Sequence, residues 1–190
     1  MSTITDCRDG HNNEFNVLAN SFLQENGLPF SQVLNADFIR QVFHDEDAFF
    51  GRDNIFSTEI VLWAFLAQTL RDGKGSACSA AVADIATYML QTGQQQPCGD
   101  TGDYCRARAK LSLTALQRLV RESSDQLEDA AEKSWLFKNL HAKLVDGFTF
   151  TMPDTPENQN AYPQIKNLPG GVGFPIARAC TVTSLATACV

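Results

Sequence analysis

The stretch Ala142-Lys-Leu-Val-Asp-Gly-Phe-Thr-Phe-Thr151 decides the fold, because the periodicity of the sequence changes there. Its side chains alternate in polarity and are rich in β-branched and aromatic types, which is typical of a β-strand. A second β-prone run covers residues 172–190, and the intervening residues 152–169 hold four of the chain's seven prolines. We therefore expect two strands separated by a loop.

Upstream of this stretch the apolar spacing is helical instead. Residues of the types that start and end helices divide this part of the chain, for example Ser57 as an N-cap and Gly93 as a stop. The helix after Ser57 is apolar around most of its circumference, which predicts a place at the centre of the core. The expected helices cover residues 15–23, 33–43, 58–70, 80–90, 101–110 and 112–127.

The fold class that follows is α+β, with a helical region over residues 1–138 and a β region over residues 139–190. The 190 residues are 44% hydrophobic and 19% charged, which is ordinary for a globular protein and argues against wholesale disorder. No apolar run approaches the length of a membrane span, and the N-terminus lacks the pattern of a signal peptide. These features predict a cytoplasmic protein without a membrane partner, whose six scattered cysteines are reduced and mostly buried.

The charge distribution limits where a nucleic acid could bind. The chain carries 15 basic and 22 acidic residues, a net charge of -7, which makes sequence-blind DNA binding by the whole surface unfavourable. Residues 105–145 are the exception, with eight basic and five acidic residues. These charges indicate either a phosphate-facing segment or the solvated faces of helices.

Asp146 is the residue most suggestive of chemistry. It follows Leu144 and Val145 in the first predicted strand, where burying a carboxylate is costly unless it has a partner or a cation. Gly147 would leave room beside it for a ligand or a second backbone. The alternative is structural, because Asp-Gly is also a strong signal for the turn of a β-hairpin.

Several runs of the sequence together resemble one known protein family. The run from Lys143 through Asp146, Gly147 and onward to Gln164, followed by Gly173-Phe-Pro-Ile-Ala-Arg and Ser184-Leu-Ala-Thr, resembles bacterial insertion-sequence transposases of the DDE type, in the group named after insertion sequence four. The upstream runs Leu62-Trp-Ala-Phe-Leu-Ala-Gln-Thr-Leu and Asp100-Thr-Gly-Asp-Tyr-Cys-Arg-Ala-Arg-Ala-Lys-Leu resemble the helical region that precedes the catalytic core of that group. The similarity covers roughly residues 50–190, in the same order.

The resemblance implies that residues 139–190 begin a ribonuclease-H-like core, in which three carboxylates hold two Mg²⁺ ions for DNA cleavage and strand transfer. Asp146 would be the first catalytic and metal-binding carboxylate. Phe148 departs from the family pattern, which has a threonine there. The second aspartate and the glutamate would lie beyond Val190, so we expect a truncated N-terminal portion, incomplete as an enzyme and binding no metal by itself.

The resemblance also implies that the region before the core works around DNA. Four residues are the candidates for DNA contact, with Arg106 and Lys110 on one helix face and Arg108 on the other; the alternative is an ordinary surface helix. The expected function is that of a transposase fragment, and the alternative is a regulatory module that pairs with full-length transposase or occupies element ends. The candidate residues are Tyr104, Arg106, Arg108 and Lys110.

Overall fold

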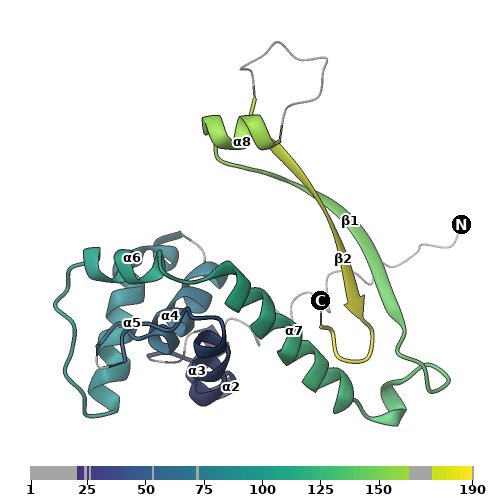
Figure 1. The fold of residues 1–190 in the computed structure, drawn as a ribbon, viewed down its shortest axis with the longest axis horizontal. Coiled ribbons are helices and arrows are strands. Elements are labelled where there is room, and N and C mark those ends of the chain that lie inside the picture. Colours follow the sequence, from purple (N-terminus) through teal and green to yellow (C-terminus); the bar gives the residue numbers. More distant parts are fainter. Residues whose placement is uncertain are drawn as a thin grey trace, which may run out of the picture. The chain divides into compact units, whose positions relative to one another are not determined.

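The computed structural model describes residues 21–23, 25, 27–52, 54–71, 73–162 and 173–189 (Figure 1). They fall into two compact units, residues 1–119 and 120–190. The described part of the chain is mostly helical and then forms a two-stranded antiparallel hairpin, so the expected mixed α+β character is confirmed. The first predicted helix, residues 15–23, lies largely outside the described residues.

Most helices of the first unit begin and end close to where the sequence predicts. The helix expected over residues 33–43 is divided, because α2 (Phe30–Val33) ends at Val33 and α3 (Ala36–Asp45) begins at Ala36. The side chain of Asn35 accepts a hydrogen bond of 2.7 Å from the amide of Asp37 at the start of α3. Gly93, with φ +69°, follows the end of α5 (Cys78–Gln91), as expected of a helix stop. The elements are α2 (Phe30–Val33), α3 (Ala36–Asp45), α4 (Thr58–Leu70), the 3₁₀ turn η1 (Gly73–Ser76), α5 (Cys78–Gln91), α6 (Gly102–Arg108) and α7 (Leu113–Asp129), whose later part belongs to the second unit.

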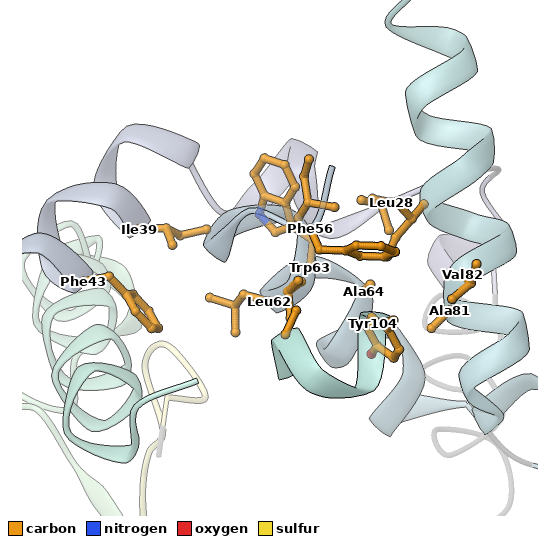
Figure 2. Packing of buried hydrophobic residues seen from close by; sticks show 14 of the residues in the cluster. Leu28, Ile39, Phe43, Phe56, Leu62, Trp63, Ala64, Ala81, Val82 and Tyr104 are labelled. Atoms are coloured by element: carbon orange, nitrogen blue, oxygen red, sulfur yellow. The ribbon is translucent and has the colours of Figure 1, made fainter. Parts of the chain in front are cut away.

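Helix α4 is the centre of the first unit, as its apolar circumference predicts. It contacts α2, α3, α5 and α6. Figure 2 shows its Leu62 and Trp63 between side chains of α3, including Phe43, and side chains of α5, including Val82. The indole of Trp63 is 4% exposed, and its Nε1 donates a 2.9 Å hydrogen bond to the carbonyl of Leu34. Trp63 is therefore a core residue, which agrees with the central place predicted for its helix.

The second unit contains the hairpin of β1 (Lys143–Thr151) and β2 (Ile176–Ser184), with the 3₁₀ turn η2 (Lys133–Trp135) before it. The expectation of a structureless connection between the strands is wrong, because it contains helix α8 (Pro156–Ala161). Thr155 caps this helix by accepting a 3.2 Å hydrogen bond from the amide of Asn158. Proline at the first helical position fits there, since that residue needs no amide donor.

Glu128, near the end of α7, joins the base of the hairpin within the second unit. Its carboxylate accepts hydrogen bonds from Nδ1 of His141 at 2.7 Å and from the hydroxyl of Thr187 at 2.6 Å. Nζ of Lys143 lies 3.0 Å away. One acidic side chain thus connects the helix, the start of β1 and the turn after β2.

None of the helices among the described residues combines the length and the apolar character that crossing a membrane requires. The expectation of mostly buried cysteines is wrong for the described part of the chain. Cys98 and Cys180 are exposed, and the others are half-buried: Cys78, Cys105 and Cys189.

Candidate nucleic-acid interface

Three of the four residues predicted to contact DNA lie in α6, and Lys110 lies just beyond its end. The helix begins after Asp100, whose side chain accepts a 3.0 Å hydrogen bond from the amide of Gly102. Because side chains four positions apart share a helix face, α6 separates the four residues into two pairs. Tyr104 and Arg108 point inward, whereas Arg106 and Lys110 are exposed.

Tyr104 is a core residue of the first unit. Its exposed fraction is 0%, and its hydroxyl donates a 2.7 Å hydrogen bond to Oε1 of Gln68 in α4. Its ring packs near Phe56, with centroids 6.5 Å apart, and Figure 2 shows it beside Ala64. Burial raises the pKa of Tyr104 to about 12. This side chain is inaccessible to a nucleic acid, so the interpretation of Tyr104 as a candidate DNA contact is wrong.

Arg108 is half-buried against the same cluster. Its Nη1 donates a 3.0 Å hydrogen bond to Oε1 of Gln68, and its guanidinium lies 5.7 Å from the ring centroid of Tyr104. Nη1 also lies 3.7 Å from the sulfur of Cys78. Arg108 is therefore held by interior partners, which leaves it poorly placed to neutralise a phosphate.

Arg106 and Lys110 line a surface hollow of about 440 Å³. Its wall includes Phe50, whose ring centroid lies 5.8 Å from Nζ of Lys110. Arg106 forms an ion pair with Asp103, but both side chains are more than half exposed. Such exposed pairs contribute about 0–1 kcal/mol, so Arg106 can exchange this partner for a phosphate oxygen.

A second cationic side chain of the 105–145 segment has internal partners. Arg118, in α7, forms ion pairs with Asp45 at 2.9 Å and Glu46 at 3.3 Å, at the end of α3. Asp45 and Glu46 are thus partly neutralised within the first unit. This leaves Arg106 and Lys110 as the pair that the hollow presents to solvent.

Asp146 lies inside β1 and is directly opposite Thr181 of β2. The alternative interpretation of Asp146-Gly147 as a hairpin turn is wrong, because both residues are paired with β2. A Cβ added at Gly147 would meet only the carbonyl oxygen of Ala179, at 3.9 Å, so no close neighbour requires glycine there. All nine residues of β1 are exposed, so the carboxylate of Asp146 is solvated and not buried as its apolar neighbours suggested.

The described residues do not assemble the carboxylates that a two-magnesium site requires. Among them, no three His, Cys, Asp or Glu side chains come close enough together to hold a metal ion. Asp146 shares its strand face with Leu144 and Phe148, which offer no metal ligand. We therefore assign no metal-dependent step to these residues.

Comparison of the chain with known protein families, with curated proteins and with solved structures finds no match. The relation to transposases accordingly stays a hypothesis based on the residues that carry the resemblance.

The cluster of polar contacts around Gln68 was not predicted from the sequence. This side chain is 8% exposed and makes four polar contacts: it accepts from Tyr104 and Arg108, and its Nε2 donates to the carbonyl of Ser76 at 2.7 Å and toward the sulfur of Cys78 at 3.6 Å. The one feature of the sequence that could have indicated the cluster is the amide side chain of Gln68 near the end of the largely apolar helix α4. A buried amide needs several partners, so Gln68 predicts nearby polar groups, but not which ones.

Proposed function

We propose that this chain is part of a DNA transposase of the DDE type and that it binds DNA through the outer face of α6. The single observation that carries the DNA-binding part is the position of Arg106 and Lys110 together at the hollow beside α6. Two cations on one exposed face can each neutralise a phosphate, whereas Tyr104 and Arg108 stabilise the helix from inside. The DNA would be the ends of the mobile element.

The finer fold assignment is part of the same proposal. Residues 139–190 would begin a ribonuclease-H-like core, with Asp146 as its first carboxylate. The hairpin supports this, because isolated two-stranded ribbons are marginal in water and the apolar side chains of β1 are solvent-exposed here. Strands with that character are expected in a larger sheet covered by further elements.

Salt dependence of DNA binding tests the proposed interface. If Arg106 and Lys110 each neutralise one phosphate, the slope of log K against log salt should be about -1.8, a loss of roughly 12-fold between 50 and 200 mM salt. The duplex would carry the inverted repeats flanking the gene, with a scrambled duplex of equal length for comparison. Replacing both residues by alanine should flatten the slope while leaving the circular dichroism spectrum unchanged.

A matched control removes the same amount of charge elsewhere. Lys74 and Lys133 are both exposed and lie outside the hollow, so Lys74→Ala with Lys133→Ala should preserve the slope. An unchanged slope in the Arg106→Ala, Lys110→Ala variant would move the interface away from α6. Failure of the unaltered chain to bind either duplex at 50 mM salt would overturn the DNA-binding proposal.

A second candidate function is a regulatory module that pairs with a full-length transposase. The exposed backbone edge and apolar side chains of β1 favour it, since unpaired edge strands template pairing with another chain. Cross-linking with a full-length transposase from the same element distinguishes the two. If the chain is a regulatory module, we expect cross-links between its hairpin and the full-length transposase. If it is a fragment that only binds DNA, we expect no such cross-links.

A further inference from the structure

Two cysteines that are distant in the sequence meet in the first unit. Cys78 is the first residue of α5, and Cys105 lies in the middle of α6. Both are half-buried and pack against the same core where α5 meets α6, and the interaction between their thiols shifts the pKa of each. The contact lies beside Gln68, in the cluster that also contains Arg108.

The surroundings of the two sulfur atoms differ. Nε2 of Gln68 lies 3.6 Å from the sulfur of Cys78, and Nη1 of Arg108 lies 3.7 Å from it. Both groups are donors, and one carries a positive charge, so negative charge on this sulfur is stabilised. The hydrogen bond from Gln68 is the main reason why the pKa of the Cys78 thiol is lowered, against the opposing effect of burial.

Cys105 has the opposite tendency. Its interaction with Cys78, together with burial, raises the pKa of its thiol, so Cys105 holds its proton more firmly than Cys78 does. The thiolate is the form that reacts with oxidants, and a neighbouring thiol is what converts an oxidised cysteine into a disulfide. The arrangement therefore supplies one reactive and one resolving sulfur.

We propose that Cys78 and Cys105 form an oxidant-responsive thiol pair, in which hydrogen peroxide oxidises Cys78 and Cys105 resolves the product to a disulfide. In the first step the Cys78 thiolate attacks one peroxide oxygen, the O–O bond breaks and hydroxide leaves. The sulfur becomes a sulfenic acid while the peroxide is reduced. In the second step the Cys105 sulfur attacks the Cys78 sulfur, the S–O bond breaks, and the departing hydroxyl takes the Cys105 proton to leave as water.

The disulfide would link the start of α5 to α6, the helix that also carries Arg106. Oxidation would also weaken the contacts that Arg108 and Gln68 make with the Cys78 sulfur, because a disulfide sulfur is neutral and a poor acceptor. The proposal concerns the chemistry of the thiols, and it stands whether or not the chain binds DNA.

Peptide mapping of the full chain after treatment with hydrogen peroxide provides the test. Under non-reducing conditions we expect a linked peptide pair containing Cys78 and Cys105, which dithiothreitol separates. In Cys105→Ser, dimedone should trap a sulfenic acid at Cys78. Cys78→Ser should abolish the link, whereas Cys98→Ser, which alters an exposed thiol outside the cluster, should preserve it.

The result in the unaltered chain does not depend on whether the serine variants fold. Absence of a Cys78–Cys105 link in that chain after peroxide treatment would overturn the proposal. So would dimedone labelling at Cys98 that is faster than at Cys78, because the Gln68 and Arg108 contacts would then confer no reactivity.

Discussion

The hydroxyl of Tyr104 donates a 2.7 Å hydrogen bond to Oε1 of Gln68 and so joins α6 to α4 inside the first unit. The same oxygen accepts from Arg108 at 3.0 Å, so one amide oxygen holds two side chains of α6. The inward face of α6 is thereby fixed. Its orientation in turn determines that Arg106 and Lys110 face the hollow.

Tyr104→Phe should lower the free energy of unfolding by about 1 kcal/mol, because it removes one buried hydrogen bond and keeps the ring. Arg108 still occupies Oε1 of Gln68, so the acceptor is not left unpaired. Urea denaturation at pH 7 measures the change. Tyr162→Phe, at a side chain 41% exposed, serves as the control and should change stability little.

The pH dependence of this effect has a definite sign. Burial raises the pKa of Tyr104 from its usual 10 to about 12, so the contribution of the protonated hydroxyl is fully present below pH 10 and is lost as the pH rises toward 12. The difference in unfolding free energy between wild type and Tyr104→Phe should therefore be the same at pH 7 and pH 9.

A Tyr104→Phe variant whose stability is unchanged but which has lost DNA binding would instead make Tyr104 a nucleic-acid contact.

Gly51, in the wall of the hollow, should tolerate no side chain. Its φ is +72°, and an added Cβ would lie 2.8 Å from the carbonyl oxygen of Phe56. Left-handed backbone strain in a residue other than glycine costs about 1–3 kcal/mol, and this backbone contact adds to it. We expect Gly51→Ala to lower the unfolding free energy by at least that amount, measured by thermal or urea denaturation.

Replacing two other glycines distinguishes the cost of left-handed backbone strain from the cost of the contact with Phe56. Gly93 has φ +69° with nothing within 4 Å of an added Cβ, so Gly93→Ala should show the strain alone. Gly99 has neither feature and should be nearly neutral when replaced by alanine. Equal losses at positions 51 and 93 would mean that the approach of Phe56 has no energetic consequence.

The helices and strands were predictable because their signals are local. The continuous apolar surface of α4 and the alternation in β1 depend on residues within one or two turns or a single strand. Helix α8 was missed because the prolines of that segment suggested a loop, although Thr155 and Pro156 together are an ordinary helix start. The helix-start signal was therefore present in the sequence, but the number of prolines nearby favoured the prediction of a loop.

The site was less predictable, because its contacts join distant parts of the chain. Spacing correctly placed Arg106 and Lys110 on one face and Arg108 on the other, but no local rule states which face is buried. The face with Tyr104 is buried because Tyr104 binds Gln68, which lies in a helix more than thirty positions upstream. The exposure of Asp146 was not predictable for a similar reason. Its apolar neighbours in β1 suggested a buried strand, but among the described residues no further layer covers β1.

Glu128 should make the base of the hairpin sensitive to acid. Hydrogen bonds from Ser184, then Thr187 and Lys143, lower the pKa of its carboxyl to about 2 from the usual 4.5. A lowered pKa in the folded state means that its contribution is present above pH 4.5 and is lost as the pH falls toward 2. The protection of the amides of residues 141–145 and 182–187 against hydrogen exchange, taken relative to their intrinsic exchange rates at each pH, should fall across that window.

Glu128→Gln tests the assignment, because the amide cannot pair with Lys143 as a carboxylate does. The variant should show faster exchange at these amides already at pH 7 and a flatter dependence between pH 4.5 and 2. Asp125→Asn, at an exposed position of the same helix, is the matched control and should behave as wild type. Identical acid responses in wild type and Glu128→Gln would assign the transition to other carboxylates.

The hairpin should make the chain self-associate at micromolar concentration. Val145 and Val182 are directly opposite on one face and are 64% and 51% exposed. In the described part of the chain the sheet has two strands, so each has one unpaired backbone edge that can pair with another copy. Size-exclusion chromatography with light scattering over a concentration series should show a mass that rises above that of the monomer.

A charged pair at these positions should suppress the association without opening the hairpin. Val145→Glu with Val182→Lys places opposite charges across the two strands, where such pairs contribute about 0.2–1 kcal/mol, while removing the apolar surface that copies would share. The control is Val33→Glu with Leu90→Lys, because both of those side chains are 66% exposed in the first unit. The hairpin variant should be monomeric and the control should associate as wild type does. A wild-type chain that stays monomeric throughout the series would show that neither the exposed edges nor these apolar side chains drive pairing.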